Sequence, residues 1–97
     1  EAIDMAVVRR AIHLEHKLLI QYSDTAGQSS ERVIWPFLLS YFEGGRLISA
    51  WCELRSNIRH FRADRISSLS EVSTRYPRRR RDLMKLGRET ENSGIAH

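Results

Sequence analysis

Residues 45–66 read GRLISAWCELRSNIRHFRADRI, and this stretch decides the fold. It contains two short runs rich in β-branched and aromatic residues, Arg46–Cys52 and Ile58–Arg62. A short polar connection near Glu53–Asn57 joins them. Two such runs with a short polar link are typical of strands paired as a β-hairpin.

Upstream of this hairpin, apolar residues recur every three or four positions, which predicts an amphipathic helix over residues 2–16. Its expected apolar stripe consists of Ile3, Val7, Ala11, Leu14 and Leu18.

Further strands are predicted at Leu18–Ser23, Glu31–Phe42 and Ser67–Thr74. Pro36 lies inside the second of these and cannot donate to a strand ladder, so we expect an edge, a bulge or a sharp bend there. The sequence Glu-Gly-Gly at residues 43–45 predicts a tight hairpin turn.

The C-terminal part predicts a short basic helix over residues 76–88 and a flexible tail over residues 89–97. Pro77 suits the first turn of a helix, and Gly87 is the expected stop. One helix, about five short strands and a second helix in so small a chain favour a closed or nearly closed small barrel.

The composition bounds the class of protein. A chain of 97 residues corresponds to one domain, and 41% hydrophobic with 29% charged residues is typical of soluble globular proteins. No apolar run has the roughly 20 residues that a membrane span needs, and no signal peptide is visible, so we expect a cytoplasmic protein with no membrane partner.

The chain begins with Glu1 rather than Met, which suggests a piece of a longer protein. The single cysteine, Cys52, excludes an internal disulfide, and its apolar surroundings predict a buried structural thiol.

The basic charge is local. Residues 1–54 carry five basic and seven acidic residues, whereas residues 55–81 carry nine arginines against two acids. Arginine binds phosphate with two parallel hydrogen bonds and stacks on aromatic rings, so phosphates or carboxylates are the expected partners. For the run at residues 78–81, a solvated basic face is the alternative interpretation.

With this order of elements in hand, the chain resembles the WYL domain of bacterial transcriptional regulators from about Ala11 to Arg88. The segments that carry the resemblance are LLIQYSD at 18–24, RVIWPFLLSYFEG at 32–44, AWCELR at 50–55, RHFRADRI at 59–66 and RYPRRRRDLMKLGRE at 75–89.

The resemblance implies a mainly β fold, an Sm-like or SH3-like five-stranded barrel over residues 18–75, with an N-terminal helix packed on it over residues 1–17. It also implies a ligand-sensing regulatory domain downstream of a winged helix-turn-helix, with single-stranded nucleic acid or an oligonucleotide as ligand. The helix-turn-helix is not among these residues, so any operator is read by a separate domain. We expect a homodimer, since regulators of this kind usually bind palindromes.

One departure from the family signature stands out. Where the signature has Trp-Tyr-Leu, alignment on AWCELR places Arg46, Leu47 and Ile48. Either Arg46 offers a cation in place of the two aromatics, or this domain binds a different ligand.

The alternation of side chains along the predicted strand Ile58–Arg62 indicates which residues can form a binding site together. If Phe61 points into the barrel, His60 and Arg62 face the other side, and Arg65 rejoins Arg62 through the turn. Asp64 is expected to orient a guanidinium through a bidentate pair, although the same pair would also serve only to hold the turn. The predicted ligand-binding residues are Arg62, Arg65, Arg59, His60, Ser49, Tyr41 and Arg46.

Catalysis is not indicated. There is no nucleophile with a supporting base, no glycine-rich phosphate loop and no paired carboxylates, so we predict no enzyme activity and no cofactor. His13 and His16 are spaced for one helix face, but they are more simply a solvated pair than metal ligands. A sensor of a small anionic metabolite and a domain that chiefly dimerises the regulator are the alternative functions.

Overall fold

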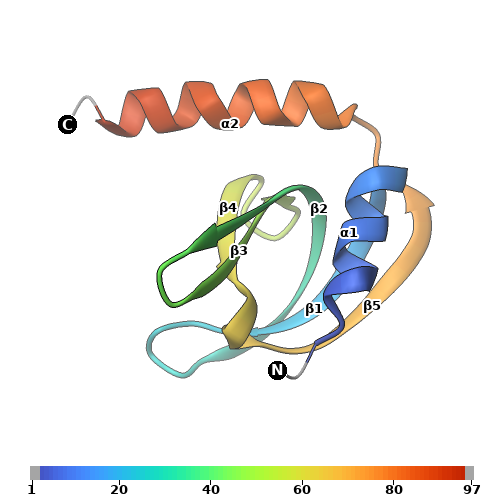
Figure 1. The fold of residues 1–97 in the computed structure, drawn as a ribbon, viewed down its shortest axis with the longest axis vertical. Helices are drawn as coiled ribbons and strands as arrows, with labels where there is room; N and C mark the ends of the chain where they lie inside the picture. Colours follow the sequence, from blue (N-terminus) through green and yellow to red (C-terminus); the bar gives the residue numbers. More distant parts are fainter. Residues whose placement is uncertain (1–2, 96–97) are drawn as a thin grey trace.

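A computed structural model describes residues 3–95, with side chains over residues 3–90, and consists of one antiparallel sheet with two helices (Figure 1). Its elements are α1 (Met5–Leu14), β1 (His16–Ser23), β2 (Ser29–Phe42), β3 (Gly45–Cys52), β4 (Asn57–Arg62), the 3₁₀ turn η1 (Ala63–Arg65), β5 (Ile66–Arg75) and α2 (Arg80–Ile95). The five predicted strands and the predicted mainly β class are therefore confirmed. No helix within the described residues is long and apolar enough to cross a membrane.

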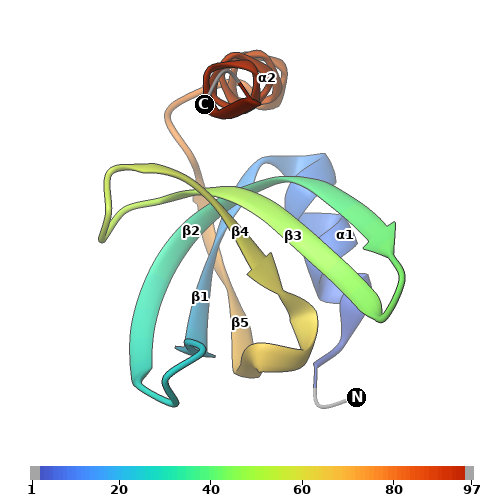
Figure 2. The ribbon, with the colours of Figure 1, turned by 90° about the vertical axis from the view of Figure 1, so that its left-hand side faces the viewer.

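The sheet is strongly curled. Its strand order is β4-β3-β2-β1-β5, so the two edge strands are consecutive in the chain. In a flat sheet these edges would lie roughly 19 Å apart. The three residues of η1 that join them span only about 6 Å, so the sheet must curl to bring its edges together (Figure 2). The pairing within residues 3–95 does not close the ring, and the assignment to an Sm-like or SH3-like barrel stays a prediction.

The curl gives the sheet an inner and an outer face. We call inner the face that packs against α1 and outer the face of β2, β3 and β4 that packs against α2. Alternate residues of the strands fill the inner face, as the period of two requires. The inner core consists of Leu18, Ile20, Ile34, Ile48, Ala50, Cys52, Phe61, Ala63 and Ile66 with Ile3, Met5, Val8, Ala11 and Ile12. Cys52 is fully buried with a free thiol, as predicted.

Helix α1 is shorter than predicted. Asp4 caps it by accepting a hydrogen bond from the Ala6 amide at 2.9 Å, and Glu15 ends it in the left-handed conformation at φ 59°. The predicted apolar stripe is right at Ala11 but wrong at Leu14, which is 43% exposed. The chain turns at Glu15 and starts β1 at His16, so the last helical residue no longer faces the sheet.

The predicted disruption at Pro36 is confirmed as a β-bulge. The pairing of β2 with β3 shifts between Pro36 and Leu38, so that Phe37 is the extra residue. Phe37 turns to the outer face and is 2% exposed beneath α2, where it packs with Tyr76 and Leu83. The bulge therefore supplies the main anchor for the C-terminal helix.

Helix α2 differs from its prediction at both ends. It begins at Arg80 rather than at residue 76, and it runs through Gly87, the predicted stop, to Ile95. A Cβ on Gly87 would lie 3.2 Å from the Phe37 ring, so the missing side chain lets α2 approach the bulge closely. The tail predicted at residues 89–97 is thus helical up to Ile95, and its last two residues lie outside the described part of the chain.

One buried carboxylate joins the two helices. Glu15 is 8% exposed and accepts hydrogen bonds from the Arg75 guanidinium at 2.7 Å and from the Arg80 backbone amide at 2.6 Å. The Arg80 hydrogen bond, with the charges of Arg79 and Arg75, holds the pKa of Glu15 below its usual value. Tyr76 adds a second tie by donating its hydroxyl to the Pro36 carbonyl at 2.9 Å.

Glu15→Gln tests this junction. Because the pKa of Glu15 is lowered in the folded state, its carboxylate stabilises the fold above the unfolded pKa near 4.5, and this contribution is lost as the pH falls through the folded pKa. We expect the variant to lose about 1–2 kcal/mol of unfolding free energy at pH 7. Urea titrations across pH should show the difference from the native protein shrinking below pH 4.5. A difference that stays constant with pH, or an equal loss in Glu43→Gln in the exposed β2–β3 turn, would contradict this role.

Candidate ligand-binding groove

The outer face carries rows of side chains that cross three strands. Leu38 pairs with Ser49, and Ser49 with His60, so these three side chains lie side by side. Two residues along, Leu47 pairs with Arg62, which places the Arg62 row roughly 7 Å from the His60 row. The predicted parity of β4 is confirmed, since Phe61 is 1% exposed on the inner face while its neighbours face outward.

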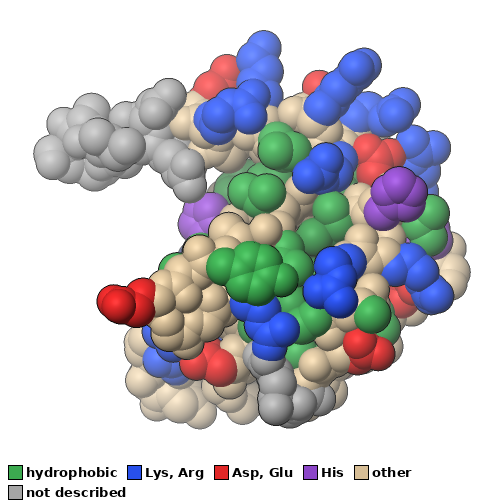
Figure 3. Space-filling view, in the orientation of Figure 1, with side chains coloured by type: hydrophobic (Ala, Val, Ile, Leu, Met, Phe, Trp, Pro, Cys, Tyr) green, Lys and Arg blue, Asp and Glu red, His purple; other side chains and the backbone are tan. Residues whose placement is uncertain are grey.

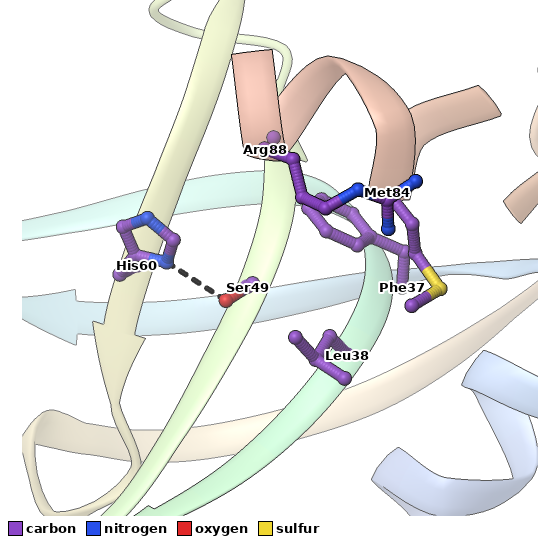
Figure 4. Close-up of a pocket in the computed structure, with 7 residues that line it drawn as sticks. Phe37, Leu38, Ser49, His60, Met84 and Arg88 are labelled. Carbon is purple, nitrogen blue, oxygen red and sulfur yellow. Dashed lines mark hydrogen bonds between the residues drawn. The ribbon is translucent and has the colours of Figure 1, made fainter. Parts of the chain in front are cut away.

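Helix α2 covers the row formed by Leu38, Ser49 and His60. Figure 4 shows Leu38, Ser49 and His60 rising from the strands and Met84 and Arg88 descending from α2. The cavity between them has a volume of about 180 Å³ and is lined by Phe37, Leu38, Ser49, His60, Met84, Gly87 and Arg88. We call this cavity, together with the adjoining Arg62 row, the outer groove. Since ligand pockets usually measure about 300–1,000 Å³, the cavity fits one ring or one phosphate of a larger ligand.

Polar groups in the cavity are few and ordered. The Ser49 hydroxyl and His60 Nδ1 are 2.7 Å apart, in hydrogen-bond contact (Figure 4). Ser49 is only 3% exposed, so this contact satisfies a hydroxyl that is almost entirely buried. A mostly apolar cavity with a small number of fixed polar groups is the usual form of a small-ligand site.

Arg62 stands at the open side of the groove. Its guanidinium lies over the Phe42 ring, 5.4 Å from the centroid, and donates to Asp64 through Nε at 3.1 Å and Nη2 at 2.9 Å. The predicted bidentate pair is thereby confirmed. This hydrogen-bonded pairing lowers the pKa of Asp64 and raises that of Arg62. It uses two of the three guanidinium nitrogens, so among the described residues Nη1 keeps its donors for another acceptor.

Arg65 takes a different direction. Its Nη1 donates to the Asp24 carbonyl at 3.2 Å, in the loop between β1 and β2. Its charge still contributes to the low pKa of Asp64, after the larger effects of Arg62. The Asp64 carboxylate is therefore paired with Arg62, whereas the Arg65 guanidinium bonds the β1–β2 loop, and only Arg62 reaches Phe42 and the groove.

The other predicted residues lie elsewhere. Arg59 pairs with Ala50 on the inner parity of β4, although its own side chain is exposed. Arg46 pairs with Tyr41 across the β2–β3 hairpin, on the opposite parity from Ser49, and Tyr41 is 68% exposed. The structure thus gathers Ser49, His60 and Arg62 on one face and leaves the remaining predicted residues outside this group.

The sequence did not predict that α2 would cover the cavity with Met84, Gly87 and Arg88. The bulge at Pro36 was a signal that its neighbour Phe37 would leave the strand pattern. Gly87 carried a second signal, since a glycine inside an otherwise helical pattern marks either a stop or a close contact. No group of three or more histidine, cysteine or acidic side chains within the described residues is arranged to hold a metal ion.

Comparisons with known proteins agree with this architecture. A family model described as the WYL domain matches residues 4–71 of the chain. Among solved structures, the chain is similar to "Proteasome accessory factor B/C (PafBC) of Arthrobacter aurescens", with a TM-score of 0.70 and 24% sequence identity. The alignment covers 75% of this chain but only 12% of that one, so this likeness concerns the fold. No curated protein sequence matches.

The packing at the bulge can be tested by truncation. Phe37→Ala should lower the unfolding free energy by about 3–5 kcal/mol, because it empties the space under α2. Leu38→Ala removes a side chain that is 36% exposed and should cost about 1 kcal/mol or less. Urea unfolding followed by tryptophan fluorescence measures both. Equal losses would contradict the assignment of Phe37 as the anchor of α2.

Proposed function

Because the chain belongs to the WYL domain family, we propose that it is the ligand-sensing regulatory domain of a transcription regulator. The ligand is a phosphate-bearing molecule, with single-stranded nucleic acid or an oligonucleotide as the leading class. It binds in the outer groove and controls a DNA-binding domain elsewhere in the parent protein. The role is one of binding, not catalysis.

The observation that carries the proposal is the placement of Arg62 over the Phe42 ring, on the same face as the cavity. An arginine held by Asp64 against an aromatic ring is fixed in orientation, so less side-chain entropy is lost when it binds a phosphate. Phe42 is 39% exposed, and together with the Arg62 guanidinium over its ring it offers a flat surface on which a base can stack. A phosphate contact beside a stacking platform is the combination that single strands require.

The size of the cavity also supports a chain-like ligand. One ring or phosphate enters beneath α2, and the rest of the ligand then follows the row of Leu47 and Arg62 along the surface. Arg88 lies at the α2 side of the cavity and adds a second cation. A ligand that spans from Arg88 to Arg62 meets positive charge at both ends, with the Ser49–His60 pair and apolar side chains between them.

A small anionic metabolite is the second candidate. The small cavity volume and the replacement of the signature aromatics by Arg46 and Leu47 favour it. Such a ligand neutralises one or two charges, so its affinity depends weakly on salt. A single strand neutralises more, and its affinity falls steeply as salt rises.

Fluorescence polarisation of a labelled 12-nucleotide single strand across a salt series tests the proposal. We expect saturable binding that weakens with salt by about 0.7 in log–log slope for each phosphate neutralised. Arg62→Ala/Arg65→Ala should lower the affinity roughly tenfold or more near 0.1 M salt and flatten the slope by about 1. Arg9→Ala/Arg55→Ala, at exposed positions of α1 and the β3–β4 loop, removes the same two charges and is the matched control, which should bind like the native protein.

Equal binding by the double variant and the control would count against the outer groove. Binding of a dinucleotide as tight as that of the 12-nucleotide strand, with a shallow salt slope, would favour the small-ligand alternative.

A further inference from the structure

A second concave surface lies where the end of α1 meets the start of α2. It has a volume of about 440 Å³ and is lined by His13, Leu14, Glu15, Arg75, Arg79, Arg80 and Arg81. None of these residues lines the cavity of the outer groove. Arg81 and Arg88 are seven residues apart on α2, so the two surfaces are separated by about 10 Å along the helix. We call the second surface the basic end.

Positive charge exceeds negative charge at the basic end. Its lining holds four arginines and a single carboxylate, that of Glu15. Glu15 is already shared by the Arg75 guanidinium at 2.7 Å and by Arg79 Nε at 3.5 Å. Arg81 is exposed and makes no hydrogen bond or ion pair with any described residue. Three positive charges therefore remain unbalanced.

Three of these arginines, Arg75, Arg79 and Arg81, are nevertheless exposed to water, whereas Arg80 is half-buried. The side chains of Arg75 and Arg79 are 59% and 63% exposed, although both contact Glu15. Glu15 contacts one side of each guanidinium and leaves the solvent-facing side open to a ligand. In Figure 3, Lys and Arg side chains gather along α2 and around its junction with α1. A second anion bound from outside would relieve the repulsion between these charges without displacing Glu15.

The chemistry of the lining indicates what kind of anion binds. The cations are arginines rather than lysines, and a guanidinium matches the geometry of a phosphate oxygen pair. The lining contains no Phe, Tyr or Trp, so it lacks the large aromatic rings on which single-stranded bases usually stack. The backbone amide of Arg80 at the start of α2 is already bonded to Glu15, and its Nε donates to the Phe37 carbonyl at 2.7 Å. The exposed guanidiniums of Arg75, Arg79 and Arg81 are therefore the groups that remain for the ligand.

We propose that the basic end binds the phosphodiester backbone of double-stranded DNA without reading its bases, as a site separate from the outer groove. A backbone contact of this kind positions a protein on a duplex and carries no sequence information. The surface would then hold the domain against DNA while the outer groove stays accessible to its own ligand.

Binding of a labelled 20-base-pair duplex of arbitrary sequence tests this, measured by fluorescence polarisation from 25 to 200 mM salt. Arg79→Gln/Arg81→Gln should flatten the log–log salt slope by about 1–2 and lower the affinity roughly tenfold or more at low salt. Arg9→Gln/Arg55→Gln removes the same charge from exposed positions of α1 and of the β3–β4 loop. This control should change the affinity about twofold or less.

Arg81→Glu serves as a second variant, because Arg81 has no described contact whose loss would unfold the protein. It should weaken duplex binding with unchanged thermal unfolding. The Arg62→Ala/Arg65→Ala variant should keep its duplex binding, which separates this site from the outer groove.

Equal losses in the two charge-matched double variants would overturn the proposal, since generic positive charge would then explain binding. Unchanged duplex binding by Arg81→Glu would also overturn it. Tighter binding of polyglutamate than of the duplex would assign the surface to an acidic protein instead.

Discussion

The fold depends on one covalent constraint, the three-residue link of η1 between the two edge strands. Because β4 and β5 lie at opposite ends of the pairing order, so short a link forces the sheet to curl. Curling creates an inner face that α1 fills and an outer face on which β2, β3 and β4 present side chains to α2. The two surfaces to which we assign binding lie outside that inner core, so they can vary in charge and shape while the core stays packed.

The position of α2 is what turns the outer face into a groove. Three contacts that are distant in sequence hold it: Glu15 at its first turn, Tyr76 against the Pro36 carbonyl, and Gly87 against the Phe37 ring. Each meets the bulge of β2 or the end of α1, so the helix is fixed relative to both faces of the sheet. The cavity between α2 and the strands is small because Gly87 lets the helix approach closely. The carboxylates then hold different arginines: Asp64 pairs with Arg62 at the outer groove, and Glu15 pairs with Arg75 and Arg79 at the basic end.

Local patterns in the sequence were sufficient to predict the strands. The period of two in β4, the glycine turn between β2 and β3 and the proline at the bulge each depend on a few neighbouring residues, and all were predicted correctly. The bidentate pairing of Asp64 followed from a spacing of two residues. The alternation of side chains along β4 likewise separates Phe61 from the outward residues His60 and Arg62.

The tertiary placement of α2 had no comparable local signal. Gly87 has the same local appearance as a helix stop, and only its contact with Phe37, fifty residues earlier, explains why the helix continues. Glu15 gave no sign that it would accept hydrogen bonds from Arg75 and from the Arg80 amide. For the same reason the sequence left open whether the arginines at residues 78–81 join the Arg62 site, whereas the folded chain places Arg79, Arg80 and Arg81 on a second surface.

Mapping the ligand on the folded domain tests the central claim most directly. Amide chemical shifts of the ¹⁵N-labelled protein, recorded while a short single-stranded oligonucleotide is added, report each position separately. We expect saturable shifts at Leu38, Ser49, His60 and Arg62 on the strands and at Arg88 on α2. Shifts confined to other surfaces, or none at saturating oligonucleotide, would contradict the outer groove as the ligand site.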